Sequence, residues 1–379
     1  MSNIELYDVA IIGGGLAGLS LAIQCAEQQL QVVLFEKEDY PFHKVCGEYI
    51  SLESWDFLCR IGLQITDFNL PVIKMLKLSD CSGRTYPFKL PLGGFGISRY
   101  LLDNALYKIA IKKGVRVYTN TRVNNIEYTQ DKFTVTTNNE IIKAKIAAGC
   151  FGKRSNIDIK WNRDFIKQKP NALNNYIGIK YHIRHNHAKE EIALHNFYNG
   201  YCGMSKIEND KSCLCYLTTA DNLRSAGNSI KEMENRVLFK NPEIEAIFNR
   251  ADFLYKEPIA ISQVSFSKKK QVENHVLLLG DAAGMISPLC GNGMSMALHS
   301  SELAYSVITD FFDQKYSREE MERKYIGLWQ KNFSSRLFIG RNVQRLFGGN
   351  LSTSLFLKAM NAFPPVATAV IKSTHGTSF

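Results

Sequence analysis

The segment that most constrains the fold is Tyr7–Lys37, which reads YDVAIIGGGLAGLSLAIQCAEQQLQVVLFEK. A short apolar run, Val9–Ile12, leads into glycines spaced as GxGxxG. Apolar residues then recur at helical spacing, and a second apolar run, Val32–Phe35, ends in an acid. The pattern predicts a strand, a glycine turn, a helix and a second strand, which together form a βαβ unit.

This glycine turn predicts a dinucleotide site. The three glycines permit a tight turn, the close approach of a pyrophosphate and the packing of the helix on the strand. Free N–H groups and the helix dipole favour negative charge at the start of the helix, and an acid about 20 residues further on can accept hydrogen bonds from a ribose. The residues that we expect to bind the dinucleotide here are Gly13, Gly15, Leu16, Ala17, Gly18, Glu36 and Lys37.

A second motif, LLLGDAAGMISPLCGNGMSMAL from Leu277 to Leu298, distinguishes FAD from NAD. An aspartate at the end of its strand can accept hydrogen bonds from the ribityl hydroxyls of FAD. The Gly-Asn-Gly turn places a helix N-terminus near the edge of the flavin that becomes negative on reduction. The motif therefore predicts FAD as the cofactor, with contacts from Gly280, Asp281, Pro288, Gly291, Asn292, Gly293 and Met294.

The rest of the chain divides by its strand and helix patterns. Hydrophobic residues make up 45% of the 379 residues, which suits two or three packed units. We predict an α/β fold (α+β overall) with a Rossmann-like FAD-binding domain and an inserted antiparallel-sheet substrate domain. The FAD-binding domain takes residues 1–72, 98–160 and 272–330, the substrate domain takes 73–97 and 161–271, and a helical segment takes 331–379. We expect helices near 100–113 and 230–240.

Cysteine spacing and net charge indicate the cellular compartment and the kind of partner that we expect. The nine cysteines form no CxxC pair, and the N-terminus leads straight into a strand, so we expect a cytoplasmic protein with reduced thiols. The net charge of +10 favours an anionic partner such as a dinucleotide, an acidic carrier protein or a membrane surface. We interpret the run Lys268–Lys270 as a solvated strand end, and no nucleic-acid motif accompanies it. We expect a monomer or a homodimer.

The C-terminal segment LFLKAMNAFPPVATAVIK, residues 355–372, is apolar in patches. A lysine and a pair of prolines interrupt it, and no apolar run in the chain approaches the ~20 residues of a membrane span. Two alternatives fit this segment: helices packed on the core, or a peripheral contact with a membrane.

Together these segments resemble the superfamily of FAD-dependent monooxygenases and geranylgeranyl reductases, which shares the para-hydroxybenzoate hydroxylase type of fold. The resemblance covers most of residues 4–310. It implies that the arginine opening the next helix, Arg99 in GISRYLLDNAL, contacts the cofactor. We also expect Val123 at the cofactor.

Within this superfamily the sequence favours the reductase branch. Where aromatic hydroxylases carry an Asp-Gly pair tied to NAD(P)H, this chain has Phe151 in GCFGKRS, and the halogenase pattern WxWxIP is absent. The segment KVCGE, Lys44–Glu48, matches a segment of geranylgeranyl reductase-like proteins. By resemblance, its residues Lys44, Cys46 and Gly47 lie beside the flavin ring. NAD(P)H or another external donor would have to visit the site transiently.

The substrate strand has diverged from the reductase pattern. GYCGMSKIE, residues 200–208, keeps a Gly-Tyr start but lacks the tryptophan and the Phe-Pro of the reductases, so geranylgeranyl itself is not implied. We expect Tyr201 and Met204 to contact a hydrophobic small-molecule substrate.

Cys46 and Glu48 are the catalytic candidates. Four alternatives stand for the cysteine: it shapes the flavin pocket, it assists catalysis, it is an ordinary buried thiol, or it forms a redox pair with Cys290. A nearby Lys44 would lower the pKa of such a thiol. Glu48 either relays protons with a raised pKa or only hydrogen-bonds its loop. Neither the histidines nor the cysteines are spaced as a metal site.

Three functions follow, in order of preference. The first is hydride transfer from reduced flavin to a C=C bond of a prenyl, polyene or polyketide-like molecule. The second uses the same fold with O2 to hydroxylate an aromatic or polyketide-like ring. The third is a flavin-binding accessory protein without turnover.

Overall fold

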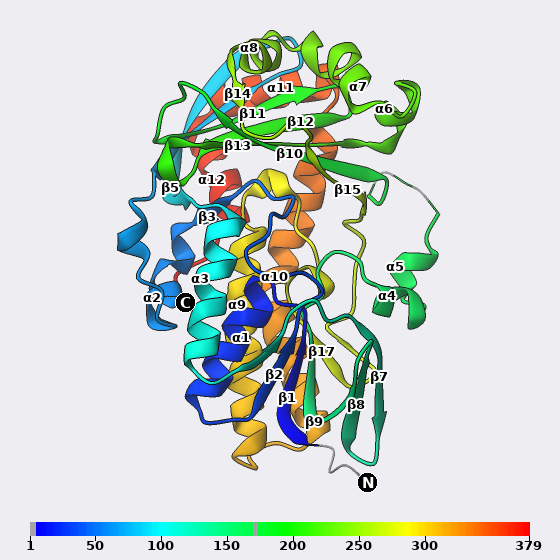
Figure 1. Ribbon diagram of the computed structural model, residues 1–379. Helices are drawn as coiled ribbons and strands as arrows, with labels where there is room; N and C mark the ends of the chain where they lie inside the picture. Colours follow the sequence, from blue (N-terminus) through cyan, green and yellow to red (C-terminus); the bar gives the residue numbers. More distant parts are fainter. Residues whose placement is uncertain (1–4, 170, 172) are drawn as a thin grey trace.

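The computed structural model describes residues 5–169, 171 and 173–379, so residues 1–4, 170 and 172, which fall within the predicted domain ranges, lie outside it. Its lower half in Figure 1 is built on a sheet in which β16, β17, β9, β1, β2 and β6 are neighbours in that order. The pairs β1–β2, β1–β9, β2–β6 and β9–β17 are parallel. A meander, β7 and β8, extends this sheet from β9. The strands are β1 (Leu6–Ile12), β2 (Val32–Phe35), β6 (Arg116–Tyr118), β7 (Val123–Thr129), β8 (Lys132–Thr137), β9 (Ile141–Gly149), β16 (Val272–Glu273) and β17 (Val276–Leu278).

Helices cover the parallel sheet, and the helix that follows the glycine turn, α1, is enclosed by two of them. Residues 16–25 of α1 are all buried, because this helix packs against both α3 and α9. The sequence GLAGLSLAI supplies small and aliphatic side chains on every side of the helix, as a fully enclosed helix requires. The helices are α1 (Leu16–Glu27), α3 (Arg99–Lys112), α9 (Gly293–Phe312) and α10 (Arg318–Leu346).

A second sheet lies across the upper half of Figure 1, below α6, α7 and α8. Its strand order is β14, β10, β13, β12, β11, β4, β5 and β3, with β15 also paired to β10. All pairs are antiparallel except β11 with β4. The strands are β3 (Tyr49–Ser51), β4 (Val72–Ser79), β5 (Thr85–Gly96), β10 (Tyr176–Arg184), β11 (Glu191–Phe197), β12 (Gly200–Lys206), β13 (Ser212–Thr219), β14 (Asp252–Phe253) and β15 (Ile259–Val264).

The two faces of the second sheet bury different apolar clusters. The outer face packs under α6 (Ala220–Ser225), α7 (Ile230–Arg236) and α8 (Pro242–Arg250). The inner face packs against the C-terminal helices α11 (Asn350–Ala362) and α12 (Pro364–Thr374). The predicted fold class is confirmed: a parallel FAD-type sheet, an antiparallel second sheet and C-terminal helices.

The remaining helices are short and lie in the connections. They are α2 (Trp55–Arg60), α4 (Asn156–Lys160), α5 (Asp164–Lys167), and the single turns η1 (Leu52–Ser54), η2 (Ile65–Phe68), η3 (Glu208–Asp210), η4 (Leu238–Lys240), η5 (Gly280–Ala282) and η6 (Pro288–Cys290). Among the described residues no single helix is long and apolar enough to cross a membrane. Taken together α11 and α12 pass that test of length and composition, but the pair is bent by 111°.

Candidate functional site

The glycine turn joins the end of β1 to the start of α1. Gly13 has a φ of +108°, and a Cβ there would overlap the backbone at Cys150, the residue that follows β9. A Cβ on Gly18 would overlap the carbonyl oxygen of Gly13. These two glycines are therefore required for the turn and for packing the helix on the strand. Gly18 is buried and does not border the cavity described below.

Gly15 lies in a more open environment, in which its nearest neighbours are the cationic side chains of Arg99 and Lys44. Its backbone is extended, and a Cβ there would lie 3.6 Å from Arg99 Nη2 and 3.7 Å from Lys44 Nζ, which is ordinary contact. Free N–H groups at the start of α1 and two cationic side chains thus face the same space. This arrangement suits a pyrophosphate, because both the helix start and the cations attract phosphate oxygens.

Asp103 holds the two cations at the glycine turn. Arg99 donates from Nε and Nη2 to the two carboxylate oxygens of Asp103, each at 2.7 Å, and Lys44 Nζ lies 3.2 Å from the same carboxylate. Burial alone would raise the pKa of Asp103, but the Arg99 and Lys44 charges outweigh burial and lower it. Asp103 is therefore an anion that positions both cations.

Glu36 lies at the end of β2, directly beside the turn. Its Oε2 accepts from the backbone N–H of Gly14 at 2.9 Å, and its Oε1 accepts from the N–H of Glu38 at 3.2 Å. The Tyr40 hydroxyl donates to the Gly14 carbonyl at 2.5 Å. The carboxylate is thus held at the edge of the turn, where the sequence predicted a ribose-binding acid.

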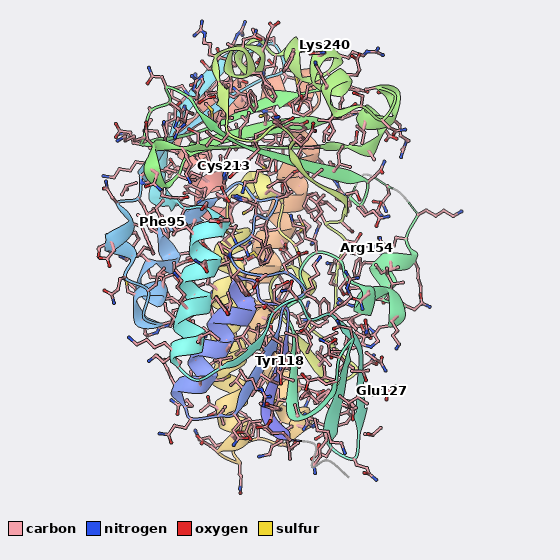
Figure 2. The ribbon with its side chains drawn as sticks, viewed as in Figure 1. Phe95, Tyr118, Glu127, Arg154, Cys213 and Lys240 are labelled. Carbon is pink, nitrogen blue, oxygen red and sulfur yellow. The ribbon has the colours of Figure 1, made fainter. Side chains whose placement is uncertain are left out.

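A cavity of about 1060 Å³ extends from the glycine turn to the inner face of the second sheet. Figure 2 shows one of its lining residues, Arg154, between the two layers. Ligand sites usually measure ~300–1,000 Å³, so this cavity has room for a large cofactor and more. The predicted cofactor residues that border it are Gly13, Gly15, Leu16, Ala17, Glu36, Lys37, Lys44, Cys46, Gly47, Arg99, Val123, Gly280, Asp281, Pro288, Gly291, Gly293 and Met294.

Asn292 does not border the cavity. Its side chain is buried, and its amide donates to the carbonyl of Thr374 at the end of α12. The Asn292 amide is thus used within the protein, and contact between Asn292 and the cofactor stays a prediction. The neighbouring Gly293 and Met294 do face the cavity, where they begin α9.

Lys269 precedes the second cofactor motif in the sequence and hydrogen-bonds to its backbone at Asp281. Its ammonium donates to the carbonyls of Asp281 and Lys153, each at 2.8 Å, and lies 4.3 Å from the centre of the Phe165 ring. Burial lowers its pKa to about 8. The expected solvated run at 268–270 is thus wrong for its central residue, which turns inward while Lys268 and Lys270 are exposed.

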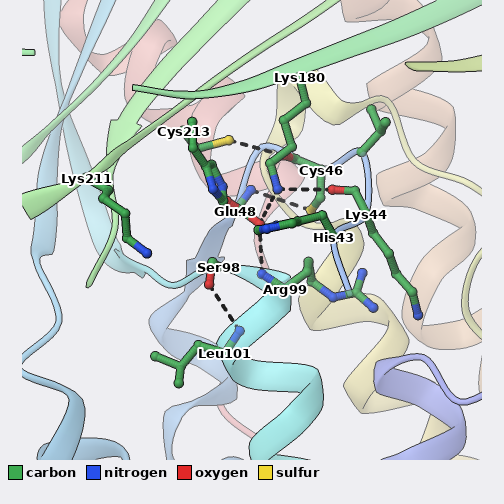
Figure 3. Close-up of polar contacts among 12 residues, drawn as sticks. His43, Lys44, Cys46, Glu48, Ser98, Arg99, Leu101, Lys180, Lys211 and Cys213 are labelled. Carbon is green, nitrogen blue, oxygen red and sulfur yellow. Dashed lines mark hydrogen bonds and ion pairs between the residues drawn. The ribbon is translucent and has the colours of Figure 1, made fainter. Parts of the chain in front are cut away.

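Glu48 is the centre of a buried polar cluster (Figure 3). Its side chain is fully buried, and one carboxylate oxygen accepts from the backbone N–H of Arg99 at 2.8 Å and contacts the Lys180 ammonium. The other oxygen lies 2.6 Å from His182 Nε2. Lys180 and His182 alternate along β10 and face the same side of the sheet. Glu48 therefore ties the 44–48 loop to the start of α3 and to the second sheet.

Of the two alternatives for Glu48, the one that required a raised pKa does not agree with the structure. Burial by itself would raise the pKa of this carboxyl, but the Lys180 charge and the His182 contact outweigh burial and lower it to about 2. A carboxyl with this pKa is ionised at neutral pH and holds no proton to donate. Of the two roles predicted for Glu48, the structure favours hydrogen bonding within the loop and extends it to the neighbouring sheet.

Tyr255 and His43 extend the cluster toward the surface, and the sequence did not predict that they lie together. The Tyr255 hydroxyl lies 2.8 Å from His43 Nε2 and 3.3 Å from His182 Nδ1, and Tyr255 is 37% exposed. Burial and the Lys180 charge lower the pKa of His43 to about 4. These contacts form a continuous polar path from the buried carboxylate to the surface.

One metal arrangement is geometrically available in this cluster. Glu48, His182 and Cys213 offer ligand atoms within 4.8 Å of one another. The Lys180 ammonium contacts the same carboxylate, and its charge opposes a cation there. The absence of a metal stays a prediction.

Cys46 is half-buried at the edge of the cavity. Its Sγ accepts from the backbone N–H of Glu48 at 3.5 Å, and its carbonyl accepts from Cys213 Sγ at 3.2 Å. Lys44 is held by Asp103 and Glu36 at the glycine turn. Cys290 borders a separate apolar pocket, where a Cβ on Gly340 would lie 3.2 Å from its sulfur.

The two predicted substrate residues lie on different faces of β12. Both border the cavity, but Tyr201 belongs to the inner apolar cluster and Met204 to the cluster under α6, α7 and α8. Side chains three positions apart on a strand point to opposite faces, which explains the difference. Substrate contact stays a prediction for both, and Tyr201 is better placed for it.

The fold and this site define an FAD-dependent oxidoreductase with the para-hydroxybenzoate hydroxylase type of fold. The residues fit FAD because one cavity joins a pyrophosphate turn, a ribose acid and a second motif at a helix start. The chain belongs to the FAD binding domain family, which matches residues 6–309. The resemblance seen in the sequence is therefore confirmed.

Individual relatives are distant. The chain is 22% identical to conditioned medium factor receptor 1 of Dictyostelium discoideum, over 99% of this chain and 75% of that protein. It is 23% identical to a digeranylgeranylglycerophospholipid reductase of Methanococcus vannielii, over 86% of this chain and 83% of the reductase. A solved flavin-dependent brominase superposes with a TM-score of 0.81 at 16% identity, over 99% of this chain and 94% of the brominase. At that identity the likeness to the brominase shows the fold alone.

Proposed function

We propose that this protein is a reductase that uses FAD to saturate an activated C=C bond of a hydrophobic prenyl, polyene or polyketide-like molecule. When bound, the flavin supplies a hydride equivalent, and water or a protein group supplies the proton. The sequence contains a single GxGxxG, so we propose that the electrons come from a transient external donor, either NAD(P)H or a carrier protein.

The observation that carries the proposal is the apolar wall of the cavity on the second sheet. The wall borders the same cavity as the 44–48 loop, and this loop matches the reductase pattern in sequence. An apolar wall excludes water and favours a substrate with little polarity. The residues of the wall are Ile192, Leu194, Tyr201, Leu217, Ile261 and Val264, with Met285 and Ile286 from the connection after η5.

Glu48 acts here as a positioning residue. It fixes the backbone of the loop that carries Cys46, because its carboxylate binds α3 and β10 at once. The same contacts hold the first turn of α3, where Arg99 faces the glycine turn. The Glu48 carboxylate thus positions the 44–48 loop and the first turn of α3 relative to the second sheet.

The proposed reaction is tested by reducing the FAD-loaded protein without O2 and then adding a candidate alkene. We expect the flavin absorbance at about 450 nm to return without O2, with one saturated product formed per flavin. Mass spectrometry of the product checks the added hydrogens. The control is the same mixture with the saturated analogue, which should leave the flavin reduced.

Two outcomes would contradict this function. Reoxidation only after O2 is admitted, with an oxygenated product, would indicate a monooxygenase. Failure of NAD(P)H, ferredoxin-like proteins and dithionite to reduce the bound flavin would indicate an accessory protein.

For Cys46 we propose a shaping role. We expect Cys46→Ala and Cys46→Ser to bind FAD and to change the rate of anaerobic reoxidation by less than about threefold, because a small side chain is retained. Cys46→Leu should slow the same step at least ~10-fold, because a larger side chain enters the cavity wall. Stopped-flow absorbance with FAD-saturated variants measures these rates. Loss of reoxidation in both small variants, with flavin still bound, would make Cys46 a catalytic residue.

A further inference from the structure

The outer surface of α11 and α12 exposes large apolar side chains. Among the described residues, fourteen large hydrophobic side chains are exposed, and the four most exposed all lie between residues 338 and 363. They are Leu351 (80%), Leu355 (65%), Phe338 (63%) and Phe363 (62%), and Val366 (53%) follows on α12. Leu351 and Leu355 are one helical turn apart, so they share a side of α11. Such a concentration of apolar surface marks an interaction site.

The charge of this region is entirely of one sign. From Arg323 to Phe379 the sequence has eight lysines and arginines and no aspartate or glutamate. Arg345, Lys358 and Lys372 are exposed. A protein partner with its own mixed charges would not require this asymmetry, whereas an anionic lipid surface attracts each nearby Lys or Arg by about 1 kcal/mol.

The geometry of the two helices suits a surface position. They are bent by 111° around Phe363, and Pro364 and Pro365 at the bend are exposed. A bent pair with apolar side chains outward and lysines beside them matches a segment that lies in the lipid interface.

The same helices close an apolar pocket on their inner side. This pocket, of about 90 Å³, is lined by Phe356, Met360, Val370 and Ile371 from α11 and α12 and by strands of the second sheet. Tyr49, Ile192, Leu194, Pro288 and Gly291 line both this pocket and the main cavity. The helices that carry the exposed apolar side chains thus line a pocket that adjoins the main cavity.

We propose that α11 and α12 dock this protein on an anionic lipid bilayer, with Leu351, Leu355, Phe363 and Val366 inserted at the interface. This docking brings the side of the molecule that carries the pocket next to the bilayer. The docking does not depend on the reaction proposed above, so it can be tested without turnover.

The test is sedimentation of the FAD-loaded full chain with vesicles of phosphatidylcholine alone or with about 30% phosphatidylglycerol. We expect binding to the anionic vesicles that weakens as salt is raised, since salt screens the lysines. The variant Leu355→Ser/Phe363→Ser should bind at least ~30-fold more weakly, because two apolar side chains no longer enter the interface. The variant Lys358→Glu/Lys372→Glu should lose the preference for anionic vesicles.

The matched control is Ile111→Ser/Ile141→Ser, which removes two side chains that are 46% and 52% exposed elsewhere on the molecule. This control should sediment with vesicles like the unchanged protein. Thermal unfolding of every variant checks that the fold is retained. Equal vesicle binding by the Leu355/Phe363 variant and the unchanged protein would overturn the proposal. A concentration-dependent dimer that this variant abolishes in the absence of vesicles would assign the surface to a second copy of the chain and overturn it as well.

Discussion

Gly15→Val is expected to remove FAD binding while leaving the fold intact. The backbone of Gly15 is extended, which any residue adopts, and a Cβ meets only the ends of the Arg99 and Lys44 side chains. Added methyl groups would instead occupy the space in which phosphate oxygens must approach the N–H groups of α1. We expect the dissociation constant of FAD to rise at least ~100-fold, a loss of about 2.7 kcal/mol. Titration of the apoprotein, followed by flavin fluorescence, measures this change.

Two variants separate this effect from damage to the fold. Gly327→Ala, in α10, places a methyl group in open space, and we expect it to change neither FAD affinity nor the free energy of unfolding by more than ~1 kcal/mol. Gly18→Val should lower the free energy of unfolding, because its Cβ would overlap the Gly13 carbonyl. If Gly15→Val binds FAD as tightly as the unchanged protein, the phosphates do not lie at this turn.

The fold was predictable because its signals are local. The turn between β1 and α1 depends on glycines within one short segment, and Glu36 follows at the end of the next strand. Likewise Asp281 and Gly293 belong to one motif that carries its own strand end and helix start. Each motif is complete within about 30 residues, so sequence spacing specified its geometry.

The contacts around Glu48 were not predictable, because they depend on the register of distant strands. Lys180 and His182 lie more than a hundred residues from Glu48, and they meet it only because β10 pairs with β13 in one particular register. A shift by one residue would turn both side chains to the opposite face. Alternation along YIGIKYHIR shows that the lysine and histidine share a face, but the sequence does not say what that face covers.

The position of Lys269 also depends on contacts with distant segments, which the sequence does not specify. A run of three lysines is usually solvated, and two of the three are. The central lysine turns inward because the carbonyls of Lys153 and Asp281, from two other segments, offer it acceptors. The Asn292 side chain is also positioned by a distant segment, because its amide donates to the carbonyl of Thr374 on α12. Both outcomes depend on which segments lie side by side.

Glu48→Leu is expected to lower the free energy of unfolding by about 3–5 kcal/mol, because the Lys180 ammonium is left buried without its carboxylate. Lys180→Met should cost less, since the carboxylate keeps the N–H of Arg99 and His182 as partners. The double variant Glu48→Leu/Lys180→Met should recover much of the loss, because neither charge is then left alone. Urea unfolding of the four proteins gives the coupling energy of the pair.

The pH dependence of this coupling follows from the lowered pKa of Glu48. The pKa of the folded carboxyl is about 2, below its ordinary value of 4.5, so its stabilisation is complete above that ordinary value. The stabilisation is lost as the pH falls through about 2, where the folded carboxyl takes up its proton. The difference in unfolding free energy between the unchanged protein and Glu48→Leu should therefore shrink from pH 5 towards pH 2. A coupling energy near zero at neutral pH, or a difference that does not shrink with acid, would show that the loop is held by other contacts.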